Sequence, residues 1–157
     1  MDVAGRGLLA IYLQDHHAAG TAGVRLARRV GSRAGGRSEL AVVANEIAED
    51  LRTLERIMTE LDVEPSRSKD VVALIAERLG RLKPNGRLVR RSPLSDLLEL
   101  ETLVVGITGK QALWQSLRAT RSCSDEELDL LLERADSQKG RVEAERMQAA
   151  RRVCQET

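Results

Sequence analysis

Apolar residues recur at alternating spacings of three and four through long segments of this 157-residue chain. That period places them along one face of an α-helix. The three prolines, Pro65, Pro84 and Pro93, fall within one third of the chain, so the segments on either side contain no proline to interrupt a helix. The pattern therefore predicts an all-α protein.

The same pattern predicts four long helices and a shorter one. The first spans Gly7–Val30, and the second runs from an N-cap at Ser38 to about Leu61. The shorter helix is expected near Ser68–Leu82. The third long helix opens with Ser92-Pro93, an N-cap followed by proline at the first helical position. The last opens with the capping box that starts at Ser124.

The composition is that of one globular domain, residues 1–157. Hydrophobic residues make up 42% and charged residues 31%, which excludes wholesale disorder. Tyr12 and Trp114 are the only aromatic residues, so the core must be built from aliphatic side chains, as suits packed helices. Trp114 is expected to pack in that core with its indole N–H at an edge.

The lengths of the segments predict the topology. The first two long helices are joined by a short loop, as are the last two, so each pair should be antiparallel neighbours. About 30 residues separate the pairs, and a helix of about 15 residues can climb roughly 22 Å, most of the way along the bundle. We expect a bundle of four long helices with a crossover helix; a plain five-helix up-down bundle is the alternative.

With this helix order, the stretches Asp15-His16-His17, Ala48-Glu49-Asp50 and Glu99-Leu100-Glu101 resemble ferritin-like proteins, especially small bacterial ones. The resemblance implies a crossover between the second and third long helices. Di-iron members carry Glu on two helices and Glu-x-x-His on the other two. Here the first helix offers His16, the second has Glu49 where His belongs, and the last has no His. The resemblance therefore implies the fold without the usual oxidase or iron-storage activity.

Several polar residues interrupt the predicted apolar faces. Glu101 has apolar neighbours three and four residues away on both sides, so it should face inward, whereas Glu99 should face water. His16 should also face inward, with His17 peripheral. Three more residues are expected to face the interior: Glu46, Asp50 and Gln138.

These residues support two interpretations. His16, Glu46, Asp50 and Glu101 could converge to bind Fe or Mn. Alternatively they form a hydrogen-bonded structural network, in which Glu101 needs a partner such as Arg141 or Lys139 because a lone buried carboxylate is costly. The network is the preferred interpretation, since His16 and His17 are the only histidines.

The net charge of +1 hides a segregation of charge along the chain. Two runs of bases contain no acid, and the expected topology puts both at one end of the bundle, opposite an acidic end near Asp62 and Asp125. An anionic partner (nucleic acid, a phosphorylated ligand or an acidic protein surface) could bind there, although no nucleic-acid motif or stacking aromatic accompanies the bases. The candidate residues are Arg28, Arg29, Arg33, Arg81, Arg87, Arg90 and Arg91.

No signal peptide or apolar run of about 20 residues is present, and Cys123 and Cys154 make no disulfide framework, so we expect a cytoplasmic protein without a membrane partner. Cys123 has acidic neighbours that should raise its pKa. The leading hypothesis is a non-catalytic bundle that acts through protein contacts as a homodimer. In it the small-residue face of the first helix packs inside the bundle or against a second subunit. A metal-binding oxidoreductase and an anion-binding module are the alternatives.

Overall fold

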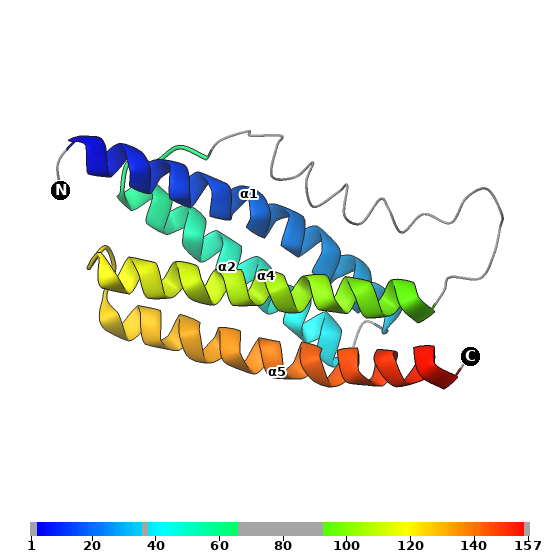
Figure 1. Ribbon diagram of the computed structural model, residues 1–157. Helices are drawn as coiled ribbons and strands as arrows, with labels where there is room; N and C mark the ends of the chain where they lie inside the picture. Colours follow the sequence, from blue (N-terminus) through cyan, green and yellow to red (C-terminus); the bar gives the residue numbers. More distant parts are fainter. Residues whose placement is uncertain (1–2, 36–37, 66–92, 156–157) are drawn as a thin grey trace, which may run out of the picture.

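The computed structural model describes residues 3–35, 38–65 and 93–155. These residues form four helices and no strand, which confirms the all-α prediction (Figure 1). The expected short helix at 68–82 lies outside the described residues, as do Arg81, Arg87, Arg90 and Arg91. The helices are α1 (Val3–Arg33), α2 (Glu39–Glu60), α4 (Pro93–Ala119) and α5 (Asp125–Gln155).

The helix termini follow the local signals closely, with one exception. Ser38 caps α2 by accepting a hydrogen bond from the N–H of Ala41 at 3.2 Å, and Ser124 accepts one from Glu127 at 3.3 Å at the start of α5. The exception is α1, which begins earlier than predicted and continues through Gly31 to Arg33. Gly31 was expected to end the helix, but it stays helical because tertiary packing holds it there.

The four helices form a ring in which each is antiparallel to its neighbours (Figure 1). α1 packs against α2 and α4 against α5, while α1–α4 and α2–α5 contacts close the ring. α2 ends where α1 begins, whereas α4 begins at the opposite end of the bundle. The two paired hairpins are therefore as predicted; the choice between a crossover and an up-down helix rests on residues outside the described part.

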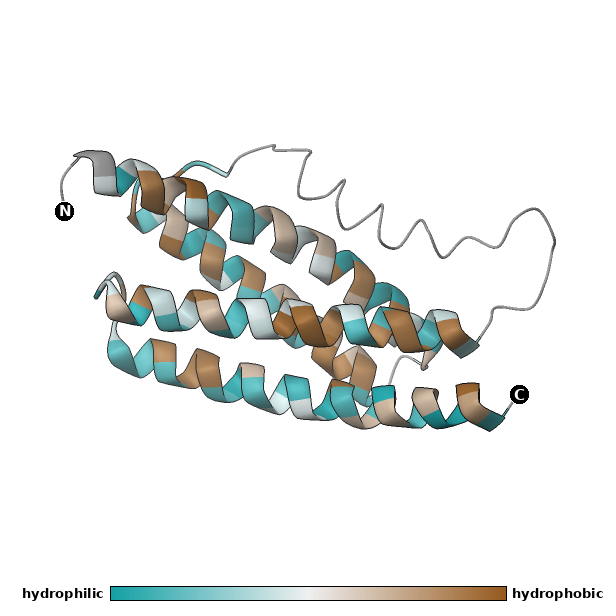
Figure 2. Ribbon diagram, in the orientation of Figure 1, coloured by the Kyte–Doolittle hydropathy of each residue, from teal (hydrophilic) through white to brown (hydrophobic). Residues whose placement is uncertain are grey.

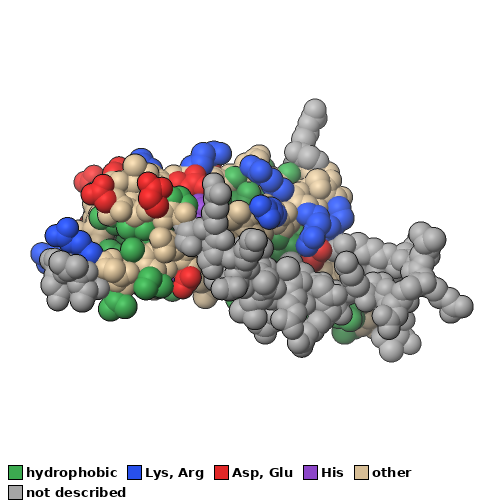
Figure 3. Space-filling model, turned by 90° about the horizontal axis from the view of Figure 1, so that it is seen from above, with side chains coloured by type: hydrophobic (Ala, Val, Ile, Leu, Met, Phe, Trp, Pro, Cys, Tyr) green, Lys and Arg blue, Asp and Glu red, His purple; other side chains and the backbone are tan. Residues whose placement is uncertain are grey.

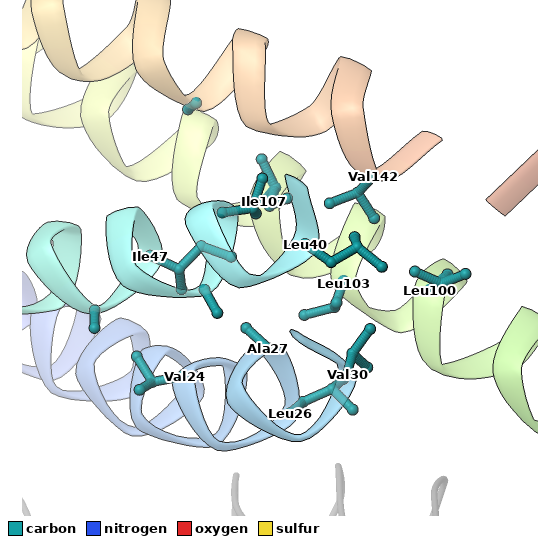
Figure 4. Close-up of a cluster of buried hydrophobic side chains, with 14 of the residues drawn as sticks. Val24, Leu26, Ala27, Val30, Leu40, Ile47, Leu100, Leu103, Ile107 and Val142 are labelled. Atoms are coloured by element: carbon teal, nitrogen blue, oxygen red, sulfur yellow. The ribbon is translucent and has the colours of Figure 1, made fainter. Parts of the chain in front are cut away.

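The interior contains two apolar clusters. The Ile107 cluster lies toward the end of α1 and takes residues from all four helices (Figure 4). The Trp114 cluster lies toward the start of α1 and includes Leu13, Ile57 and Leu128. The buried apolar residues of α4, from Leu100 to Leu117, all belong to one of these two clusters. Aliphatic side chains therefore make the core, as the composition predicts.

Close approach between α1 and α2 occurs at Gly31. A Cβ there would lie 2.9 Å from Ala41 Cα and 3.0 Å from the Leu40 carbonyl oxygen, both backbone atoms. At Gly20 a Cβ would meet only a side-chain atom of Leu51, at 3.0 Å, and at Gly23 no described atom within 4 Å. The expected backbone contact is therefore not at the small-residue middle of α1 but near its end.

Polarity differs among the helices. α4 is the most apolar of the four and has little contrast between its faces, whereas α5 is the most polar (Figure 2). None of the helices described is long and apolar enough to cross a membrane.

Candidate functional site

A group of buried and half-buried polar residues lies between the two apolar clusters, and we call it the Asp50 layer: Asp50 of α2, Lys110 of α4, and Arg134 and Gln138 of α5. Asp50 is 1% exposed and Gln138 is fully buried. Lys110 Nζ donates to Asp50 Oδ2 and to Gln138 Oε1, and Gln138 Nε2 donates to the same Asp50 oxygen at 3.1 Å. Arg134 forms an ion pair with Asp50 Oδ1. Three helices are thus joined through one carboxylate.

The negative charge of Asp50 in this layer is balanced by positive charges of Lys110 and Arg134. Burial lowers the pKa of Lys110, and the adjacent Asp50 carboxylate opposes that shift. Arg134 also lies 3.7 Å from Glu49 at the outer edge of the layer. Two cations therefore face Asp50: its Oδ2 accepts hydrogen bonds from Lys110 and Gln138, and its Oδ1, which has no hydrogen-bond partner among the described residues, is ion-paired with Arg134. The arrangement can lock helices in register, but it leaves no open carboxylate for a ligand.

Glu46 continues the same pattern one turn earlier on α2. Its carboxylate is ion-paired with Arg141 of α5, whose guanidinium also lies 3.7 Å from Glu39. Arg141, one of the two partners suggested for Glu101, instead forms an ion pair with Glu46, and Glu101 lies beside Arg146. Each inward carboxylate of α2 is therefore matched by a base on α5.

The prediction for Glu99 and Glu101 was wrong in both parts. Glu99 is buried at 6% exposure and forms ion pairs with Arg29, at 3.1 Å, and Arg33 of α1. Glu101 has a side chain 46% exposed and lies 3.5 Å from Arg146. Three of the four neighbours of Glu99 on its own helix are polar, but the face it occupies is covered by α1. The spacing of residues along one helix cannot show that another helix covers a given face.

The two histidines lie on α1 in different settings. The pKa of His16 is lowered because burial disfavours its charged form, and nearby Asp15 opposes the shift. Its ring packs edge-on against Tyr12 with centroids 4.6 Å apart. His17, expected to be peripheral, is 14% exposed and lies 3.1 Å from Glu55 of α2. It therefore bridges α1 to α2.

The predicted metal ligands do not form one cluster. Asp50 is held by Lys110, Glu46 by Arg141 and Glu101 by Arg146, while His16 packs on Tyr12. Within residues 3–35, 38–65 and 93–155, no group of three or more His, Cys, Asp or Glu side chains is arranged to hold a metal ion. The structure does bring together Asp50 and Gln138, two of the residues expected to face the interior.

Sequence reasoning missed Lys110 and Arg134. Lys110 has Gly106, Ile107, Leu113 and Trp114 three and four residues away, which is the signature of an inward position. The neighbour pattern that marks Asp50 and Gln138 as inward therefore also marks Lys110, the cation that a buried Asp50 requires.

Some arginines of the predicted basic end form ion pairs within the bundle. Arg29 and Arg33 are ion-paired with Glu99, while Arg28 makes no ion pair with any described residue. On the face seen in Figure 3, most acidic side chains lie toward the start of α1 and most basic ones toward its end, with a further basic group at the start of α1. The segregation of charge is present on this face, but two of its arginines contribute to internal contacts.

Trp114 and Cys123 complete the described candidates. Trp114 packs in the core as predicted and is 1% exposed, but its buried Nε1 has no hydrogen-bond partner among the described residues, so the expectation of an indole N–H at an edge was wrong. The pKa of Cys123 is raised by burial first and then by the charges of Glu127 and Glu60. Its thiolate is therefore disfavoured at neutral pH.

Comparison of the chain with protein-family models, with curated proteins and with solved structures found no match.

Proposed function

We propose that this chain is a non-catalytic, ferritin-like helical bundle that acts through protein contacts and self-associates as a homodimer. The ring of two antiparallel hairpins supports the ferritin-like part. The non-catalytic part is supported by the Asp50 layer and the neighbouring Glu46–Arg141 pair, in which inward carboxylates have lysine or arginine partners in place of open ligand positions.

The observation that carries self-association is the outward face of α4. A helix that is apolar on all sides is ordinarily buried on all sides, and α4 is the most apolar helix described. Leu94 is 47% exposed and Val105 71% exposed. Together with Leu98, Gly109 and Ala112 they recur at helical spacing along one stripe, which Glu101 interrupts between Leu98 and Val105. The stripe suits a helix of a second copy, with small residues that allow close packing.

The oligomer is tested by light scattering after gel filtration. We expect a dimer for the unaltered protein and a monomer for Val105→Glu, because a second carboxylate one turn from Glu101 would lose its water and be repelled by that like charge. Leu130→Glu on α5 is the matched control, since Leu130 is 68% exposed but lies off the stripe. A monomeric unaltered protein, or equal dissociation by both variants, would contradict the proposal.

The non-catalytic part is tested by loading the protein separately with Fe(II), Mn(II) and Zn(II), followed by desalting. No retained metal is expected. Retention of one or two equivalents that is lost in Glu101→Gln or Asp50→Asn would instead support the metal-binding oxidoreductase.

A further inference from the structure

A groove of about 280 Å³ lies between α1 and α2. Its floor consists of Val24, Ala48 and Leu51, and Thr21 lines one side. The groove is therefore apolar at its base, and its size is near the lower limit of small-molecule sites.

Three arginines surround this floor: Arg25 and Arg28 of α1 and Arg52 of α2. All three are exposed, and Arg25 and Arg28 make no ion pair with any described residue. Arg52 has one ion pair, with Glu49 on its own helix at 3.9 Å. The side chain of Arg52 is 65% exposed. Such a pair is weak and easily exchanged for a better partner.

One acid, Glu55, also lines the groove, but its carboxylate lies 3.1 Å from His17 Nε2. The cations of the groove are thus in excess. A second groove, of about 220 Å³, lies between the end of α1 and α5 and differs in this respect. Its two arginines, Arg33 and Arg152, are balanced by Asp96 and Glu145.

We propose that the α1–α2 groove binds a small organic anion with an apolar portion. The oxyanion, a phosphate or carboxylate, is held by Arg25, Arg28 and Arg52, because guanidinium groups form strong charge-assisted hydrogen bonds to such oxygens. The apolar portion covers Val24, Ala48 and Leu51. This site is independent of the α4 stripe, so it does not depend on the proposed homodimer.

Hexyl phosphate is the probe, with hexanol and inorganic phosphate as matched controls for its two parts. Titrations are followed by calorimetry and by NMR shifts of α1 and α2 amides. We expect saturable binding of hexyl phosphate at one site per chain, weaker binding of inorganic phosphate and no binding of hexanol.

Arg25→Gln and Arg28→Gln should each weaken hexyl phosphate binding by roughly tenfold, as the loss of one charged hydrogen bond predicts. Arg6→Gln, near the start of α1, is the control and should leave the affinity unchanged. Because these arginines are exposed, the variants should fold normally, which circular dichroism checks. No binding, unchanged affinity in both groove variants, or equal affinity for inorganic phosphate would overturn the proposal.

Discussion

At the scale of single residues, Glu99 and Glu101 show how the residues of a neighbouring helix determine whether a carboxylate is buried and which base it pairs with. Both lie in α4 two positions apart, so they point to different sides. Glu99 meets two arginines of α1 in a buried setting, whereas Glu101 meets Arg146 near the surface. The two positions are therefore a matched pair for measuring the contribution of burial to an ion pair.

Replacing Glu99 with Ala should destabilise the protein by about 2 kcal/mol, because the two ion pairs that join α4 to α1 are lost and the side chain of a buried position is truncated. We discount the usual figure for a buried pair, since the side chains of Arg29 and Arg33 are 50% and 33% exposed. Thermal unfolding should show a fall in Tm of roughly 4–8 °C. Glu101→Ala should leave Tm nearly unchanged, and the reverse order would contradict the assignment.

His16 predicts a dependence of stability on pH. Its pKa in the folded protein is below the ordinary value of 6.5, so the unfolded chain binds the proton more readily. The contribution of neutral His16 to stability is therefore present above pH 6.5 and is lost as the pH falls through the lowered pKa. His16→Gln should lose less stability than the unaltered protein between about pH 7.5 and pH 5, as measured by urea unfolding.

NMR titration of the imidazole gives the accompanying check. Asp15→Asn should lower the pKa of His16 further, because the Asp15 charge opposes the effect of burial. A pKa of His16 that rises in this variant would disprove the electrostatic assignment.

At the scale of elements, the close backbone approach between the end of α1 and the start of α2 depends on Gly31. Gly31→Ala places a Cβ against the backbone of Leu40 and Ala41, which cannot move aside as a side chain can. The variant should lose about 1–2 kcal/mol of stability, since overpacking outweighs the gain in helix propensity.

Gly23→Ala in the same helix has no described atom within 4 Å of the new Cβ. It should gain up to about 1 kcal/mol from helix propensity alone. Chemical denaturation of both variants tests the pair, and a gain of stability in Gly31→Ala would contradict the close backbone contact.

The sequence predicts elements better than it predicts partners. Caps at Ser38 and Ser124, and proline at the first position of α4, are local signals that report helix starts directly. The continuation of α1 through Gly31 depends on α2 and has no local signal. For the same reason, neighbour spacing identified Asp50 and Gln138 as buried but misassigned Glu99, whose cover comes from another helix.

At the scale of the whole molecule, charge is organised across the bundle as well as along it. The bases of α5 match the acids of α2, and the arginines at the end of α1 match Glu99 of α4. These pairs fix which helix lies beside which. These pairs also occupy side chains that the sequence had suggested for metal or anion binding, among them Asp50, Glu46 and Arg29.

The Asp50 layer divides the interior into two apolar parts, the Ile107 cluster and the Trp114 cluster, and this division has a consequence for how the bundle opens. Apolar contact is what makes neighbouring turns unfold together, so each half can act as its own cooperative unit. Amide hydrogen exchange should then resolve two levels of protection within α4, one on each side of Lys110. A single level along the helix would show that the charged layer transmits cooperativity as well as apolar packing does.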